Sequence, residues 1–191
     1  MPAGKLSRFN EGLHFVTTKT YRNHTYFADT RCCEILIEQL DYYRGRYGFK
    51  ISGYVIMPDH LHVLLWWETD EKPDLTISKI MQGIKSIVAK RIIQYVKIGE
   101  STCSRLSDDW YHENPHKRMG QEHTPPSVRI WQPSFYDYIV LSQEKFVEKL
   151  SYMHNNPVNA GLVSEAELWK FSSCAWYTKR KEYVLEMDGN I

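Results

Sequence analysis

The chain has 191 residues, of which 42% are hydrophobic and 25% charged, and its formal net charge is +1. This length and composition are typical of one globular domain, which we expect to span residues 1–191. No apolar run approaches the roughly 20 residues that cross a bilayer, and the first residues lack the hydrophobic stretch of a secretory signal. We therefore expect a cytoplasmic protein with no membrane partner. In that compartment we expect reduced cysteines: Cys32, Cys33, Cys103 and Cys174.

The first third of the chain predicts strands and one helix. Three segments combine β-branched and aromatic residues as strands do: residues 13–20, 49–57 and 60–67. Residues 30–47 carry apolar side chains at near-helical spacing, so we predict a helix that Gly48 ends. Pro58 and Asp59 are typical turn residues, and they predict a hairpin between the second and third strands.

The middle of the chain predicts a second helix and a long loop. Asp74 or Thr76 can cap the helix, in which Ile and Val residues follow the helical period to about Tyr95. Residues 99–127 are polar and contain several prolines, so we expect a long loop within the domain. Loops of this length inside compact domains are often functional or disordered.

The last third predicts a fourth strand and a third long helix. Residues 128–140 have strand character that is interrupted at Pro133. Residues 142–155 follow a helical pattern with Ser142 as the cap, and Pro157 is expected to end the helix because the residue before a proline avoids the helical region. Three side chains are expected to face inward: Phe146, Val147 and Leu150.

The predicted order of elements is β-α-β-β-α-β-α. This order indicates an α+β fold of the ferredoxin-like class, with an antiparallel sheet and helices packed on one face. The extra C-terminal helix carries Tyr152. The sequence shows no internal repeats and no low-complexity segments.

Two histidines stand two residues apart on the third predicted strand. Because side chains at i and i+2 of a strand point to the same face, His60 and His62 can bind one metal ion together. The alternative is a pair of histidines on a solvated strand face. A tight turn at Pro58 and Asp59 and a hydrophobic continuation favour a rigid central strand, which suits a metal-binding platform.

The third long helix places Tyr152 and Asn156 four residues apart, on one face. Tyr152 is a candidate nucleophile, and a nearby divalent cation would favour its phenolate. Asn156 can offer a carbonyl oxygen to a metal. The alternative is that Tyr152 belongs to the core and Asn156 caps the helix before Pro157.

The segments YVIMPDHLHVLL, SFYDYIVLSQEKFVEKLSYMHNNPVNAGLV and WKFSSCAWY carry a family resemblance. Together they resemble the REP-associated tyrosine transposases, which belong to the IS200-like, single-tyrosine HUH superfamily, where HUH means His-hydrophobic-His. The resemblance extends over about residues 13–177, most of the chain. It also implies a fold like that of RNA-recognition domains, in agreement with the predicted strand order.

The resemblance implies a specific chemistry. His60, His62 and Asn156 would hold Mg²⁺ or Mn²⁺, and Tyr152 would attack single-stranded DNA beside a short hairpin. The product would be a 5′-phosphotyrosine and a free 3′-hydroxyl, which another 3′-hydroxyl can resolve by strand transfer. The chain departs from the family pattern after the fourth strand, where Tyr138 and Leu141 stand in place of a histidine and an arginine, and in its long loop. Both departures concern DNA specificity more than chemistry.

Positive charge is concentrated in the middle of the chain. Between Lys72 and Arg105, seven basic residues oppose two acidic ones, a local net charge of +5. We expect the second helix to contact DNA, although a solvated helix face is the alternative. The candidate DNA-binding residues are Lys79, Lys85, Lys90 and Arg91.

Several further residues are weaker candidates. Some aromatic residues can stack on bases but are more often core residues: Trp66, Trp67, Trp131 and Tyr136. Three histidines in the long loop are a weak second metal site: His112, His116 and His123. His154 points away from Tyr152 around the helix, so we assign it no catalytic role.

The sequence is also compatible with two other functions. One is a domesticated module that binds DNA hairpins without cutting them. The other is a metal-dependent hydrolase that activates water and forms no covalent intermediate. The oligomeric state is also open: the resemblance to insertion-sequence relatives implies a homodimer that exchanges its tyrosine helices, and the alternative is a monomer.

Overall fold

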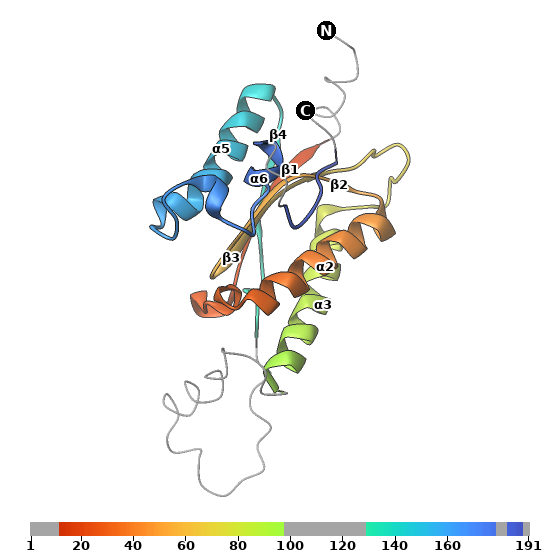
Figure 1. Cartoon of the computed structure of the whole chain (residues 1–191). Helices are drawn as coiled ribbons and strands as arrows, with labels where there is room; N and C mark the ends of the chain where they lie inside the picture. The colour runs from red at the N-terminus through yellow and green to blue at the C-terminus, as the bar shows by residue number, and fades with distance from the viewer. Residues whose placement is uncertain (1–11, 98–128, 179–182, 189–191) are drawn as a thin grey trace, which may run out of the picture.

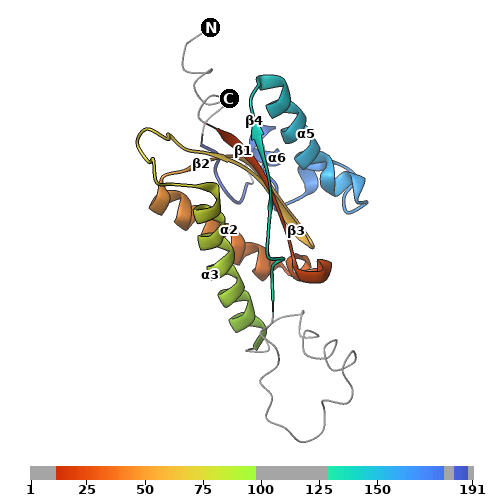
Figure 2. The same ribbon diagram turned by 180° about the vertical axis from the view of Figure 1, so that it is seen from behind.

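The computed structural model describes residues 12–97, 129–178 and 183–188. Within these ranges a sheet lies between two groups of helices, as Figure 1 and the reverse view in Figure 2 show. The predicted loop 99–127, its histidines and Cys103 lie outside the described residues. The other cysteines are buried free thiols, as predicted: Cys32, Cys33 and Cys174. No helix among the described residues is both long and apolar enough to span a membrane.

The sheet has four strands: β1 Leu13–Lys19, β2 Lys50–Met57, β3 His60–Trp66 and β4 Tyr136–Val140. They lie in the order β2-β3-β1-β4, and every neighbouring pair is antiparallel. This arrangement confirms the predicted α+β, ferredoxin-like fold class. β1 and β3 are the central strands, and Thr17 of β1 pairs with His62 of β3.

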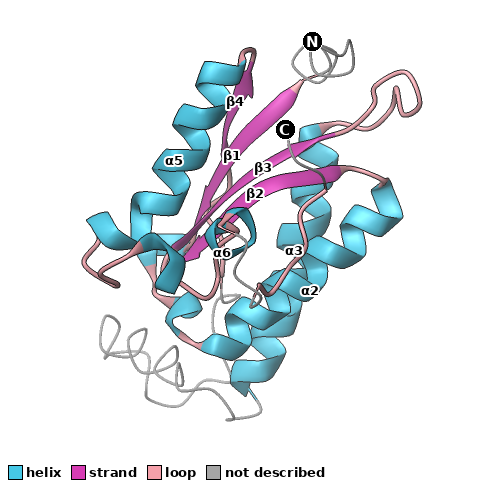
Figure 3. Cartoon of the chain, turned by 45° about the horizontal axis from the view of Figure 1, so that its top comes forward, coloured by secondary structure: helices cyan, strands magenta, loops and turns pink. Residues whose placement is uncertain are grey.

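Helices cover both faces of the sheet, as Figure 3 shows. α2 (Thr30–Tyr47) and α3 (Ile77–Lys97) pack against each other over one face. They bury the odd-numbered side chains of β3, such as Leu61 and Val63. α5 (Gln143–Asn159) covers the opposite face, where its side chains share a second hydrophobic cluster with Leu64. The alternation of a strand therefore directs the even-numbered residues of β3 toward α5.

Short helical segments complete the described fold: η1 Tyr21–Asn23, η2 Tyr26–Ala28, η4 Ala166–Leu168 and α6 Cys174–Tyr177. The predicted signals for the ends of the long helices are borne out. Gly48 ends α2 in the left-handed conformation, with φ at +69°. Of the two candidate caps for α3, Thr76 accepts a hydrogen bond from the first turn of the helix, and Ser142 caps α5 in the same way.

The prediction that Pro157 ends the last long helix is wrong. α5 continues through Pro157 to Asn159, and the amide of Ala160 closes it on the carbonyl of Asn156 at 3.0 Å. A proline in the last turn removes one backbone hydrogen bond and leaves the rest of the helix in place. The pyrrolidine ring is buried, so packing compensates for the missing bond. Asn156 is therefore a residue of the helix and not its cap.

Two further expectations are corrected. Val147 is 50% exposed and does not face inward, because the buried stripe of α5 follows Phe146 and Met153. The predicted strand 128–140 is also too long. Only Tyr136–Val140 forms β4. Trp131, which precedes the predicted break at Pro133, makes an isolated β-bridge to Thr20.

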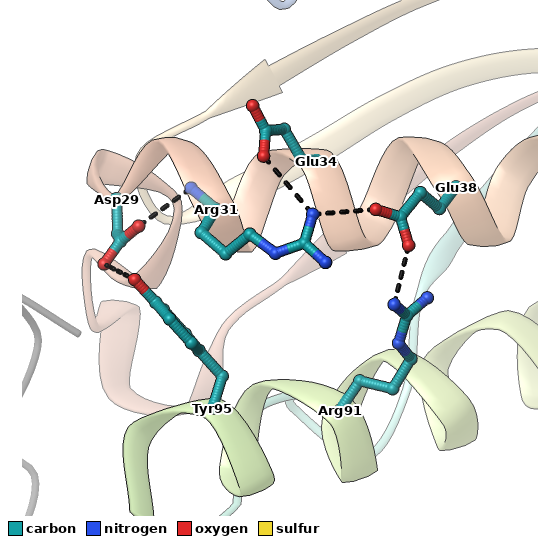
Figure 4. Close-up of polar contacts among 6 residues, drawn as sticks. All are labelled: Asp29, Arg31, Glu34, Glu38, Arg91 and Tyr95. Atoms are coloured by element: carbon teal, nitrogen blue, oxygen red, sulfur yellow. Dashed lines mark hydrogen bonds and ion pairs between the residues drawn. The ribbon is translucent and has the colours of Figure 1, made fainter. Parts of the chain in front are cut away.

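A polar network joins the exposed sides of α2 and α3, as Figure 4 shows. Arg31 contacts Glu34 at 3.3 Å and Glu38 at 2.8 Å. Glu38 also pairs with Arg91 of α3 at 2.6 Å, so one carboxylate links the two helices. Exposed ion pairs of this kind contribute little to the free energy of unfolding individually. They do, however, pair the charge of Arg91 with a carboxylate of the fold.

Candidate active site

The two histidines of β3 lie on the face of the sheet that α5 covers. Their ring centroids are 4.8 Å apart, as expected for side chains at i and i+2 of a strand. Leu61, which separates them in sequence, points to the opposite face and is buried under α2 and α3. The prediction that both imidazoles share one face is confirmed.

The imidazole of His60 is held by its neighbour in sequence. Nδ1 of His60 lies 2.6 Å from Oδ1 of Asp59. A carboxylate only accepts hydrogen bonds, so Nδ1 of His60 is the donor in this contact. Sequence reasoning treated Asp59 as a turn residue only, although a carboxylate that orients a histidine is a common feature of metal sites.

The imidazole of His62 is held from both sides. Nδ1 lies 2.7 Å from the hydroxyl oxygen of Thr17, and Nε2 lies 3.0 Å from Nδ2 of Asn156. An amide nitrogen donates, so Nε2 of His62 accepts and its Nδ1–H donates to Thr17. Burial, and then the nearby positive charge of His60 and Lys19, lowers the pKa of His62 to about 3. His62 is therefore neutral, which is the state that a metal ligand requires.

α5 brings Tyr152 and Asn156 to the same place. The ring centroid of Tyr152 lies 5.4 Å from that of His62 and 6.2 Å from that of Phe15. Its side chain is 51% exposed, so the phenol is accessible to a large substrate. The structure thus brings together both predicted histidines and both predicted α5 residues, which lie 90 or more positions apart along the chain.

These residues line an open pocket of about 430 Å³. Further residues around it were not singled out from the sequence: Phe15, Thr17, Lys19 and Lys149. Lys149 precedes Tyr152 by one helical turn, and its Nζ lies 5.6 Å from the ring centroid of Phe15 and 5.0 Å from that of Tyr138. The two lysines give the pocket a positive charge, which suits a phosphate group.

The donor atoms of the pocket are compatible with a divalent metal ion. No group of three or more His, Cys, Asp or Glu side chains within the described residues could hold one. A site here would therefore use the Nε2 atoms of His60 and His62 together with the amide oxygen of Asn156, once the amide turns and its nitrogen releases Nε2 of His62. Imidazole nitrogen is a softer ligand that disfavours Mg²⁺, the amide oxygen suits Mg²⁺ or Mn²⁺, and such a set leaves positions open for a substrate.

The predicted DNA-binding residues of α3 lie on the other face of the sheet, away from this pocket. Two of them already have partners in the fold. Lys85 donates to the backbone carbonyls of Gln132 at 2.9 Å and Ser134 at 3.0 Å, and Arg91 pairs with Glu38. Burial lowers the pKa of Lys85. Lys79 and Lys90 are exposed, so a DNA contact remains a prediction for these two.

The aromatic residues considered for base stacking separate into two groups. Tyr136 is exposed and lines the pocket. The three tryptophans are buried in the core, which contradicts a stacking role: Trp66, Trp67 and Trp131. Strand alternation and packing under the helices explain their burial, since large aromatic rings are also the best core fillers.

His154 lies outside the pocket, as expected from its angle on α5. It is buried, and its Nε2 lies 2.8 Å from the hydroxyl oxygen of Ser173. That hydroxyl is also 3.0 Å from the amide nitrogen of Tyr54 in β2. The contact therefore fastens α5 to the sheet and to the C-terminal segment, and burial lowers the pKa of His154 to about 4.

Comparison with known proteins identifies the family of this chain. The family described as "Transposase IS200 like" matches residues 7–113, which is more than half of the chain and includes both histidines. A curated protein of Haemophilus influenzae, named as a REP-associated tyrosine transposase, is 23% identical over 145 residues, which are 75% of this chain and 69% of the relative. The solved structure of a REP-associated tyrosine transposase bound to a REP hairpin has a TM-score of 0.61 and 19% identity, with 94% of this chain and 87% of that chain covered. The chain belongs to the IS200-like transposase family.

Proposed function

We propose that this protein is a metal-dependent, single-tyrosine transposase that cleaves and rejoins single-stranded DNA through a 5′-phosphotyrosine. The observation that carries the proposal is the shared pocket of His60, His62, Tyr152 and Asn156. Family membership supports transposition in general, and the geometry of this pocket supports the specific chemistry.

The residues of the pocket have distinct tasks in this scheme. His60, His62 and Asn156 would hold Mg²⁺ or Mn²⁺, which when bound polarises a non-bridging oxygen of the scissile phosphate and stabilises the charge of the transition state. Asp59 and Thr17 hold Nδ1 of the two imidazoles, which leaves Nε2 of each as the atom that would bind the metal. Lys149 and Lys19 add positive charge where the phosphate would lie.

Tyr152 supplies the nucleophile. Its phenolic oxygen forms a bond to the phosphorus of the scissile phosphate, while the bond from phosphorus to the 3′-oxygen breaks. The phenol proton passes to solvent, and the departing 3′-oxygen takes up a proton to become a hydroxyl. A second 3′-hydroxyl can reverse these steps and join new ends, so the reaction needs no ATP.

We extend the DNA hairpin of the solved relative to this chain as its substrate class. The half-exposed position of Tyr152 is consistent with a polymer that is larger than the pocket. We expect the protein to act in the cytoplasm, as a monomer or as a homodimer.

The test is a cleavage assay with labelled single-stranded DNA that contains a hairpin, in the presence of Mn²⁺. We expect a covalent protein–DNA adduct on the peptide that contains Tyr152, and its loss in Tyr152→Phe. Tyr136→Phe, which also changes a phenol that lines the pocket, should still form the adduct at Tyr152. Chelation of the metal should abolish the adduct.

The same assay separates the alternatives. Tight hairpin binding without any adduct would indicate the non-catalytic, domesticated DNA-hairpin-binding module. Cleavage that survives Tyr152→Phe and leaves no adduct would indicate a hydrolase that activates water. Either result would contradict the proposed mechanism.

A further inference from the structure

A second groove lies on the opposite side of the sheet from the candidate active site. It has a volume of about 360 Å³ and runs between α2 and α3. Tyr43 and Tyr47 form its α2 side, and Lys79 and Lys90 lie on its α3 side. The two lysines are eleven positions apart in one helix, so their Cα atoms are separated by about 16 Å along the axis. The groove is therefore long enough for several nucleotides of an extended strand.

The α2 side of the groove is a cluster of tyrosines. The rings of Tyr43 and Tyr47 have their centroids 5.2 Å apart, and the exposed ring of Tyr42 packs edge-on against Tyr43 at 5.3 Å. The guanidinium of Arg46 lies 6.0 Å from the ring centroid of Tyr47. Tyr43 and Tyr47 are only partly buried, so the cluster offers aromatic surface to a ligand.

Space for this cluster depends on Gly83 of α3. A Cβ atom at position 83 would come within 2.9 Å of Cε1 of Tyr43 and 3.3 Å of the Tyr47 hydroxyl. A glycine in the interior of a helix is otherwise unfavourable. Because Gly83 has no side chain, the rings of Tyr43 and Tyr47 can lie close to the backbone of α3.

The charge of the groove is positive. Lys79 and Lys90 are exposed, and neither belongs to an ion pair among the described residues, unlike Arg91. No carboxylate lines the groove within the described part of the chain. Their neighbours Lys85 and Arg91 are, by contrast, used inside the fold. A surface that combines exposed cations with aromatic rings is complementary to a polyanion with flat bases.

We infer that this groove is a second binding site for single-stranded DNA, in which Lys79 and Lys90 contact phosphates and Tyr43 and Tyr47 stack on bases. The inference rests on the proposed function only for the identity of the polymer. The groove and the active-site pocket lie on opposite faces of the sheet, so one strand fills both only if it is long enough to pass around the sheet. A short strand fills one of them.

The test measures binding without cleavage, so that it does not depend on the chemistry of Tyr152. Full-length protein carrying Tyr152→Phe is titrated, without divalent metal, against fluorescent thymidine oligonucleotides of increasing length. The first variant is Lys79→Gln with Lys90→Gln, and the second is Tyr43→Leu, with Tyr43→Phe as the version that keeps the ring. The control is Lys50→Gln with Lys170→Gln, which removes two exposed lysines elsewhere, one of which, Lys50, pairs with Asp188 at 3.6 Å.

We expect the lysine variant to bind long oligonucleotides roughly tenfold more weakly, and the slope of log affinity against log salt to decrease by about 1.4. Tyr43→Leu should weaken binding as well, and Tyr43→Phe should retain it. Normal thermal unfolding of each variant excludes misfolding as the cause. If the groove variants match their parent, or if the control pair weakens binding equally, the groove is not a DNA site. If the lysine variant binds more weakly but Tyr43→Leu binds like its parent, base stacking on Tyr43 is ruled out.

Discussion

The side-chain amide of Asn156 lies 3.0 Å from Nε2 of His62, although 94 positions separate the two residues. The contact forms because the even-numbered side chains of β3 face α5, and because Asn156 lies one helical turn beyond Tyr152. The same packing thus positions a candidate metal ligand and the candidate nucleophile. The chemistry of the site depends on how α5 docks on the sheet.

Asn156→Ala should weaken metal binding strongly while leaving the fold intact. The substitution removes the amide oxygen that completes the proposed ligand set, and we expect the affinity for Mn²⁺ to fall by at least tenfold. Titration of the purified protein with Mn²⁺, followed by electron paramagnetic resonance, measures the change. The matched control is Asn155→Ala, since the amide of Asn155 is exposed and donates to the carbonyl of Ser151. Equal Mn²⁺ affinity in both variants would rule out Asn156 as a ligand.

Thr17→Val should release the imidazole of His62. Valine has a similar shape but cannot accept the Nδ1–H hydrogen bond that the threonine hydroxyl accepts at 2.7 Å. A buried donor without a partner costs about 1–3 kcal/mol, and loss of an orienting partner typically lowers metal affinity by about 10- to 100-fold. Chemical unfolding and Mn²⁺ titration measure the two effects. Thr17→Ser keeps the hydroxyl and should behave like the parent. If Thr17→Ser loses as much stability and Mn²⁺ affinity as Thr17→Val, packing and not the hydrogen bond is the cause.

Much of the fold could be predicted because its signals are local. Alternation, helical periodicity and capping residues such as Gly48 and Ser142 act within a few positions. The errors arose where tertiary packing overrides a local rule. Burial of Pro157 compensates for the backbone bond that it cannot make, so α5 continues beyond the expected end. Val147 faces solvent because the packing of α5 on the sheet, which local sequence does not specify, decides which side chains of the helix are covered.

The candidate site could be predicted only in part, for the same reason. His60 and His62 share a face by strand geometry, and Tyr152 and Asn156 share a face by helix geometry. Spacing alone does not predict that the histidine face of the strand meets the tyrosine face of the helix. That prediction rested on the family resemblance. Thr17 could not be singled out, since its role depends on the register between β1 and β3. The sequence likewise gave no sign that Lys85 is engaged by two backbone carbonyls.

Acid should destabilise this protein because its two buried histidines stay neutral at pH values where the histidines of the unfolded chain take up protons. Burial lowers the pKa of His62 to about 3 and of His154 to about 4, whereas an unfolded histidine has a pKa of about 6.5. The unfolded chain therefore binds more protons than the folded chain below about pH 6.5, so stability falls as the pH decreases. Each histidine should cost about 2 kcal/mol between about pH 7.5 and about pH 5.

His154→Gln isolates one of these contributions. Glutamine can still hydrogen-bond to Ser173 but does not titrate, so the loss of stability between about pH 7.5 and about pH 5 should shrink by about 2 kcal/mol. Urea unfolding with a chelator present measures the difference without any metal contribution. An unchanged pH dependence would show that His154 is not kept neutral by the fold.

Gly45 inside α2 and Gly48 at its C-terminal end should respond to alanine in opposite directions. A Cβ atom at Gly45 meets nothing within 4 Å, and the position lies inside the helix, so Gly45→Ala should stabilise the protein by about 0.5–1 kcal/mol. Gly48 ends the helix with φ at +69°, and a Cβ atom there would also meet the side chain of Lys72. Gly48→Ala should therefore destabilise the protein by about 1–2 kcal/mol. Thermal unfolding of both variants measures the contrast, and a stabilising Gly48→Ala would show that the helix does not need a left-handed residue at its end.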